Sequence, residues 1–138
     1  MQRRPIRTYR DLDDWQLAVD LVVAVHRLVR RIPVPERYDF AGQMRGAARS
    51  VSANIAEGFG RDHLGDYLRS LAAARGSLFE VESDLYVLRA LALVGDAELE
   101  TPLSLTDRIG RMLTNHAKSL RKGSNGPRRP KTFFDDDA

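Results

Sequence analysis

The sequence contains no cysteine and only three histidines among its 138 residues. Without cysteine the fold cannot depend on disulfide bonds, and neither thiolate catalysis nor cysteine-ligated zinc is available. The histidines, His26, His63 and His116, stand far apart, and none follows a glutamate at the Glu-x-x-His spacing of di-iron helical bundles. We therefore expect no metal site and no other cofactor.

The sequence also lacks a long apolar run. Its most apolar stretch, residues 17–29, is interrupted by Asp20, His26 and Arg27, and it is shorter than the roughly 20 residues that a membrane span requires. The basic residues near the N-terminus are not followed by the apolar segment of a secretory signal. These absences predict a cytoplasmic protein without a membrane partner.

No sequence motif of a known catalytic class is present. There is no GxSxG around Ser50 or Ser52, no phosphate-binding GxxxxGKS loop, and no GxGxxG after a strand. The amides of the turn at residues 58–61 could hold one phosphate, but a helix stop is the favoured interpretation of its glycines. We expect a protein that is not an enzyme; a catalytic alternative would require a polar, water-filled cavity around Asn54 and Glu57.

Helical periodicity runs through most of the chain. The predicted helices cover residues 13–32, 39–58 and 62–94, with Asp39 and Asp62 as N-caps and Gly95 as the terminator of the third. A fourth ends near Lys122 and begins at Asp96 or at Thr101–Pro102. The third carries an unbroken heptad seam, made of Tyr67, Leu71, Ala74, Leu78, Val81, Leu85, Leu88 and Ala92.

These features predict an all-α fold, an up-and-down antiparallel four-helix bundle over residues 11–122. We expect a basic flexible arm at residues 1–10 and a disordered tail at residues 123–138, so that both termini are disordered. The first helix has an apolar arc wider than one core requires, which predicts a central position or an additional subunit interface. In the second helix, Gly42 and Gly46 predict close packing against a neighbouring helix.

Charge is distributed unevenly around a net value of +3. Residues 1–10 carry +4 and residues 118–138 carry +3, whereas residues 11–117 carry −4. Basic segments on a weakly acidic body are typical of proteins that attract phosphate backbones, although they can also serve solubility alone. The candidate nucleic-acid-binding residues are Arg3, Arg4, Arg7, Arg10, Arg121, Lys122, Arg128, Arg129 and Lys131.

Polar side chains cluster on the second predicted helix among small residues. We expect Asn54 and Glu57 to be partly buried and therefore to need hydrogen-bond partners. Either could bond the amides of the turn that follows, or Glu57 could pair with Arg49 or Arg61. A structural role is favoured over a catalytic one for this cluster, which comprises Gln43, Arg45, Arg49, Ser50, Asn54 and Glu57.

The same segment resembles the signature of a bacterial family, the four-helix-bundle proteins encoded within intervening sequences of 23S rRNA genes. Its most specific part is N-I-A-E-G-F-G-R at residues 54–61. One departure is Gly46, which stands where the family usually has a second arginine. The matching residues are Gln43, Arg45, Ala47, Ala48, Ser50, Asn54, Ile55, Ala56, Glu57, Gly58, Gly60 and Arg61.

The resemblance implies a bundle that assembles with itself into a ring, a pentamer in the family. It also implies a relation to the accessory proteins of diversity-generating retroelements, whose positively charged ring binds nucleic acid and a reverse transcriptase. Our leading hypothesis is therefore a non-enzymatic, oligomeric accessory protein that binds RNA or DNA. The alternative is a scaffold or adaptor that binds a reverse transcriptase or another protein without contacting nucleic acid.

Overall fold

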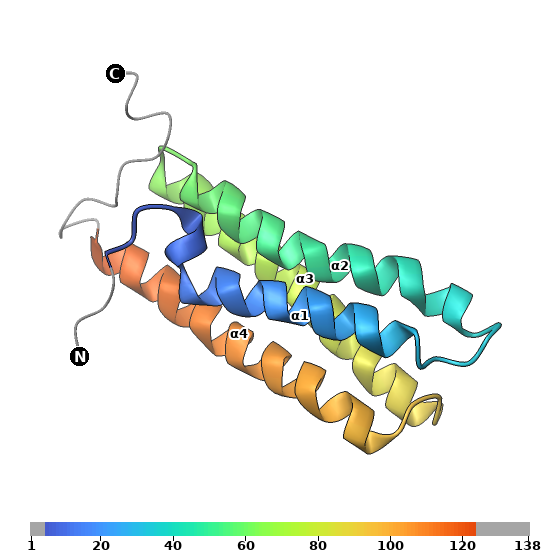
Figure 1. Ribbon diagram of the computed structural model, residues 1–138. Coiled ribbons are helices and arrows are strands. Elements are labelled where there is room, and N and C mark those ends of the chain that lie inside the picture. Colours follow the sequence, from blue (N-terminus) through green and yellow to red (C-terminus); the bar gives the residue numbers. More distant parts are fainter. Residues whose placement is uncertain (1–4, 124–138) are drawn as a thin grey trace.

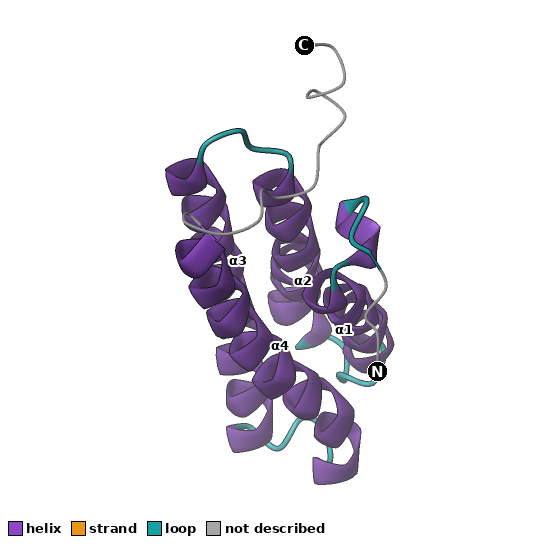
Figure 2. Ribbon diagram, turned by 90° about the vertical axis from the view of Figure 1, so that its left-hand side faces the viewer, coloured by secondary structure: helices purple, strands orange, loops and turns teal. Residues whose placement is uncertain are grey.

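The computed structural model describes residues 5–123 as an antiparallel bundle of four helices. A short 3-10 helix, η1 (Tyr9–Asp11), precedes α1 (Asp13–Val29), α2 (Arg37–Phe59), α3 (Leu64–Ala90) and α4 (Asp96–Lys122) (Figure 1). Each helix packs against its neighbours in the chain, and α4 closes the bundle against α1. Over the described residues the elements are helices joined by loops (Figure 2). The predicted all-α, up-and-down four-helix bundle is confirmed.

The boundary between α3 and α4 differs from the predicted one. α3 ends at Ala90 rather than Val94. Ala92 has a left-handed backbone conformation, with φ of 55°, and a right-handed α-helix cannot continue through it. Gly95 does not terminate α3 but is the N-cap of α4, which therefore begins at Asp96, the earlier of the two predicted starts. At the other end of α3, Asp62 is not the N-cap; His63 occupies that position.

The connection between α1 and α2 is held by an arginine that the sequence pattern did not reveal. α1 ends at Val29, earlier than the predicted Ile32, and α2 begins at Arg37, so that Asp39 lies inside the helix instead of capping it. The guanidinium of Arg37 donates to the carbonyl oxygens of Arg30 (2.8 Å) and Ile32 (3.0 Å). These carbonyls follow the last turn of α1, where backbone acceptors have no helical partner.

The predicted heptad seam of α3 forms the centre of the core. From Tyr67 to Leu88 its members are all buried, and only Ala92 lies beyond the helix. The other helices contribute fully buried side chains to the same cluster, among them Leu21, Met44 and Ile109. Among the described helices, none combines the length and apolar character that crossing a membrane requires.

The start of the described chain is an ordered turn. Thr8 caps η1 by accepting from the amide of Arg10 (3.1 Å), while Asp11 accepts from the amide of Thr8 (3.0 Å). Tyr9 packs edge-on against Trp15, with 5.2 Å between ring centroids. The described part of the arm predicted over residues 1–10 thus contains a capped turn; residues 1–4, and the predicted tail apart from Gly123, lie outside the described residues.

The glycines of α2 have two different environments. A Cβ at Gly42 or Gly46 would have nothing within 4 Å, so the close packing predicted for these two does not occur within the subunit, because both lie on the outward side of the helix. The close approach is at Gly58 instead. A Cβ there would lie 3.0 Å from the Cβ of Ser70 and 3.1 Å from the ring of Tyr67.

Most of the apolar arc of α1 is buried within its own bundle. Ala18, Leu21 and Val25 are fully buried, and the flanking Trp15, Leu17, Val22 and Ala24 are half-buried against the core. Among the large apolar side chains of α1, Val23 is the most exposed, at 44%. The apolar surface of α1 therefore does not need a second subunit to cover it.

The close contact at Gly58 predicts that a larger residue there destabilises the fold. Gly58→Ala is expected to lower the free energy of unfolding by about 1–3 kcal/mol, since overpacking against α3 outweighs the better helix propensity of alanine. Gly110→Ala is the matched control in α4, where the nearest atom would be an ordinary 3.6 Å away, and we expect it to be neutral or stabilising by up to ~1 kcal/mol. Urea denaturation measures both; equal stability of the two variants would contradict the packing at Gly58.

Candidate functional site

One end of the bundle gathers four chain segments that are distant in sequence. Because the helices alternate in direction, the starts of α1 and α3 lie beside the ends of α2 and α4 (Figure 1). The specific part of the signature, residues 54–61, therefore occupies the same end as residues 7–10 and residues 118–122. This end also contains the hydrogen bonds that join α4 to α1 and to α3.

Asn54 joins α2 to α3 through Ser50. The hydroxyls of Ser50 and Ser77 are hydrogen-bonded at 2.8 Å across the two helices. The side-chain amide of Asn54 donates to the carbonyl oxygen of Ser50 (2.9 Å) and to its hydroxyl (3.0 Å). Asn54 is half-buried as predicted, but it fixes this serine pair and does not bond the amides of the turn.

The turn after α2 is closed by its own backbone. The amide of Gly60 donates to the carbonyls of Ala56 (3.3 Å) and Glu57 (3.1 Å), and that of Arg61 donates to Gly58 (3.0 Å). These amides are therefore occupied, which favours the helix-stop interpretation over phosphate binding. Glu57 forms an ion pair with Arg61, the second of the predicted pairings, yet its side chain is 52% exposed rather than partly buried.

The remaining signature residues do not converge with Asn54. Gln43 and Arg49 are exposed, and Arg45 is half-buried with a buried Nε atom that has no hydrogen-bond partner among the described residues. Along a helix, residues 43 and 61 stand about 27 Å apart. The signature therefore marks one helix and its terminal turn rather than a single compact site.

A shallow depression lies between the end of α2 and the start of α3. It has a volume of about 250 Å³, opens widely to solvent, and contains Asn54 and Glu57 among its lining residues. Both arginines at its rim are already paired, Arg61 with Glu57 and Arg69 with Asp66. Within the described part of the chain, no three histidine or acidic side chains are grouped so that they could hold a metal ion.

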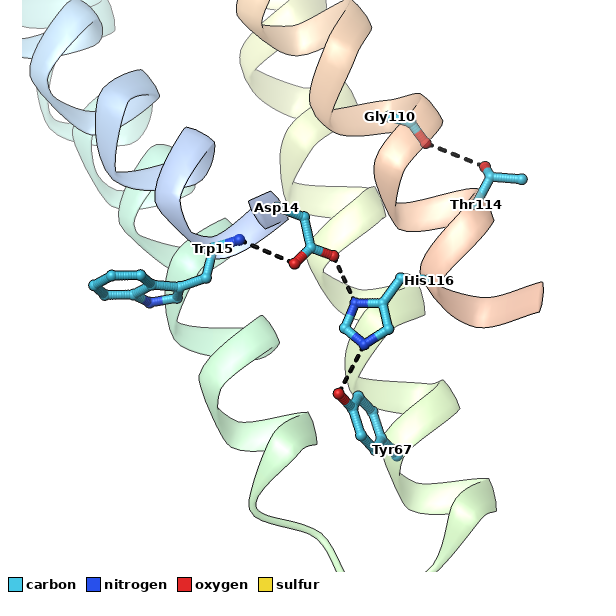
Figure 3. Close-up of polar contacts among 6 residues, drawn as sticks. All are labelled: Asp14, Trp15, Tyr67, Gly110, Thr114 and His116. Atoms are coloured by element: carbon cyan, nitrogen blue, oxygen red, sulfur yellow. Dashed lines mark hydrogen bonds and ion pairs between the residues drawn. The ribbon is translucent and has the colours of Figure 1, made fainter. Parts of the chain in front are cut away.

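The strongest polar arrangement is one that sequence reasoning missed. Asp14 of α1, His116 of α4 and Tyr67 of α3 form a continuous chain of hydrogen bonds (Figure 3). Oδ2 of Asp14 lies 2.6 Å from Nδ1 of His116, and Nε2 of His116 lies 2.7 Å from the hydroxyl of Tyr67. The other carboxylate oxygen of Asp14 accepts from the amide of Trp15 (3.0 Å).

This hydrogen-bonded chain links three helices and is shielded from solvent. Asp14 is 4% exposed and Tyr67 is 3% exposed, so both groups lie in the interior of the bundle. Nδ1 of His116 donates to Asp14, because a carboxylate oxygen is the acceptor in this pair. The sequence shows that His116 falls on the apolar stripe of α4. Its hydrogen-bond partners could not be predicted from the sequence, because Tyr67 and Asp14 are 49 and 102 residues away.

The described basic candidates lie at this end of the bundle. Arg7 and Arg10 are exposed just before α1, and Arg121 and Lys122 are exposed in the last turn of α4. Arg3, Arg4, Arg128, Arg129 and Lys131 lie outside the described residues. The fold thus places cationic side chains that are far apart in the sequence at one end of the bundle.

The buried hydrogen bond between Asp14 and His116 is expected to stabilise the fold. Asp14→Ala leaves His116 without its buried acceptor, and we expect the free energy of unfolding to fall by about 1–3 kcal/mol. Asp107→Ala removes an exposed ion pair to Arg111 and should cost at most ~0.5 kcal/mol. Chemical denaturation at neutral pH compares them; a loss no larger for Asp14→Ala than for the control would show that the buried contact is not stabilising.

The sequence of this chain matches a known protein family. The family model described as 23S rRNA-intervening sequence protein matches residues 10–115, which is most of the chain. A search of curated proteins gave no match. The matched range includes α1, α2 and α3 together with Asp14 and Tyr67 of the buried hydrogen-bond chain, and it ends one residue before His116.

Proposed function

We propose that this chain, which belongs to the 23S rRNA-intervening sequence protein family, is a non-enzymatic, self-assembling accessory protein that binds nucleic acid through one end of its bundle. The observation that carries the proposal is that Arg7 and Arg10 lie at the same end of the bundle as Arg121 and Lys122. These residues come from opposite ends of the sequence, and the antiparallel topology brings them to the same end of the molecule.

The charge distribution supports contact with phosphate backbones. Residues 11–117 carry −4, whereas the two terminal segments together carry +7, so attraction to phosphate should be strongest toward the ends of the chain. Arginine and lysine that neutralise phosphates release condensed counterions, which makes such binding weaken as salt rises. With side-chain charges alone and no base-reading motif, binding should depend little on nucleic-acid sequence.

Self-assembly would make a modest local charge effective. Each copy contributes a few cations, and a ring presents all of these on one surface, where binding by one copy raises the effective concentration for the next. The family resemblance leads us to propose a ring, pentameric as in the family, and a reverse transcriptase or another nucleic-acid enzyme as the protein partner. In this account the chain itself binds and positions, and its partner supplies the chemistry.

A second candidate function is a scaffold that binds only proteins. The net charge of −4 over residues 11–117 favours it, because an acidic body repels nucleic acid wherever the terminal cations do not reach. The two candidates separate by experiment, since a scaffold would assemble without any affinity for RNA or DNA at low salt.

The third prediction concerns salt-dependent binding. The triple variant with Arg7, Arg10 and Lys122 replaced by alanine should bind RNA and DNA more weakly, and the slope of log K against log salt should become shallower by about 2. Fluorescence anisotropy with unstructured oligonucleotides at several salt concentrations measures both quantities.

The matched control replaces Arg27, Arg31 and Arg108, which are exposed elsewhere on the molecule, and changes the net charge equally. It should retain the slope of the natural chain. An equal loss in both triple variants would mean that overall charge governs binding, and no binding by the natural chain at low salt would favour the scaffold.

A further inference from the structure

The end of the bundle that carries residues 54–61, called here the signature end, has exposed cations without acidic partners. Arg7, Lys118 and Lys122 are exposed and form no ion pair with the described residues. Lys118 and Lys122 are one turn apart, so they lie on the same face of α4. The nearby carboxylate of Asp11 is engaged by the backbone amide of Arg7, at 2.8 Å. Cations that are not neutralised by the fold attract an anionic group from elsewhere.

The contact between α1 and α4 explains why these cations gather at one end. The hydrogen bond of 2.6 Å between Asp14 and His116 fixes the level of the two helices (Figure 3). From this pair, Arg10 lies four residues toward the N-terminus and Lys122 lies six residues toward the C-terminus. The carbonyl oxygen of Arg10 accepts from the side-chain amide of Gln16 at 2.8 Å, which ties this segment to α1. The backbones that carry both cations are therefore fixed in the fold.

Exposed apolar side chains stand beside these cations. Ile6 is 38% exposed and Tyr9 is 37% exposed, and they are next to Arg7 and Arg10 in the sequence. Leu64, the first residue of α3, is 39% exposed at the same end of the bundle. A surface that mixes cationic and apolar groups suits an occupant that carries carboxylates next to aromatic rings.

The chain itself contains a segment of this composition. Residues 133–137 read Phe-Phe-Asp-Asp-Asp and lie outside the described residues. They include all the acidic residues that follow Gly123, the C-cap of α4, and Gly123 directly follows Lys122. Twelve residues lead from Gly123 to Asp135 and can span up to about 40 Å, which is the length of α4 itself. The connection begins Gly-Ser-Asn-Gly-Pro, residue types that allow a chain to turn back.

We infer that residues 133–137 dock on the signature end of their own chain, with their carboxylates at Arg7 and Lys122 and their aromatic rings against Ile6 and Tyr9. Three consecutive carboxylates present a row of negative charge, as a phosphate backbone does, so this acidic segment and nucleic acid compete for the same cations. The covalent connection raises the effective concentration of the segment to the order of millimolar. Only the competition rests on the proposed function; the docking does not.

The test for docking uses the single tryptophan of the chain. Trp15 lies at the signature end against Tyr9, and the chain has no cysteine, so Ala138→Cys places one nitroxide label beside the acidic segment. In the full-length chain, freed of nucleic acid and at low salt, the label should quench Trp15 fluorescence. The triple change Asp135→Asn, Asp136→Asn and Asp137→Asn should abolish most of this quenching, and high salt should do the same.

The matched control neutralises three exposed carboxylates elsewhere, with Asp20→Asn, Asp39→Asn and Glu100→Gln, and changes the net charge equally. It should keep the quenching of the natural chain. Equal quenching with the natural and the neutralised acidic segment would overturn the inference, and this is also the result expected if the aspartates pair with arginines of residues 124–131 instead. Circular dichroism confirms that all variants are folded.

Competition is measured with the same variants without the label. In fluorescence anisotropy at one low salt concentration, neutralising the acidic segment should tighten binding of an unstructured oligonucleotide roughly 3- to 10-fold. The reason is that apparent affinity falls in proportion to the fraction of chains whose binding surface is free. The control should stay within about twofold of the natural chain.

The outcomes separate the two proposals. Equal gains in affinity for the variant and the control would overturn the competition. If none of the chains binds the oligonucleotide but the quenching depends on residues 135–137, the proposed function is contradicted and the docking is supported. If the chains bind but the quenching is unaffected by the triple change, the docking is overturned and the proposed function is not.

Discussion

The buried seam of α3 is the contact on which the other three helices depend. α3 packs against both α2 and α4, and its side chains from Tyr67 to Leu88 form a continuous apolar column through the bundle. α1 is then held from the side, by α2 and α4 and by the hydrogen bonds that connect Asp14 through His116 to Tyr67. Since Tyr67 belongs both to the seam and to this polar chain, the apolar and polar interactions reinforce each other at one end of the molecule.

The same helix also fixes how closely, and at which level, α2 packs against it. Gly58 allows α2 to approach α3 closely at Tyr67, and the serine pair of Ser50 and Ser77 fixes their register. The alternating directions of the helices bring the start of α1 and the end of α4 to the same end of the bundle as residues 54–61.

Periodic features were predictable from the sequence, and contacts between distant residues were not. The heptad spacing of α3 and the apolar stripe of α4 depend on neighbours in the same helix, so both the fold class and most of the core follow from them. The caps at Asp39 and Asp62 were wrong because Arg37 and the backbone at His63 decide where those helices start. The role of Gly42 and Gly46 was misplaced because spacing reveals which residues share a face, but not what lies opposite that face. Of the candidate site, the Glu57–Arg61 pair was predictable from its spacing, whereas the partners of His116 required the tertiary structure.

We propose that nucleic acid contacts the end of the bundle at which α1 begins and α4 ends. Ultraviolet crosslinking of bound RNA to the full-length chain, followed by peptide mapping, tests it most directly. The account predicts crosslinks in peptides around residues 7–10 and 118–122, and few elsewhere. Crosslinks concentrated at the opposite end, around residues 27–37, would contradict it.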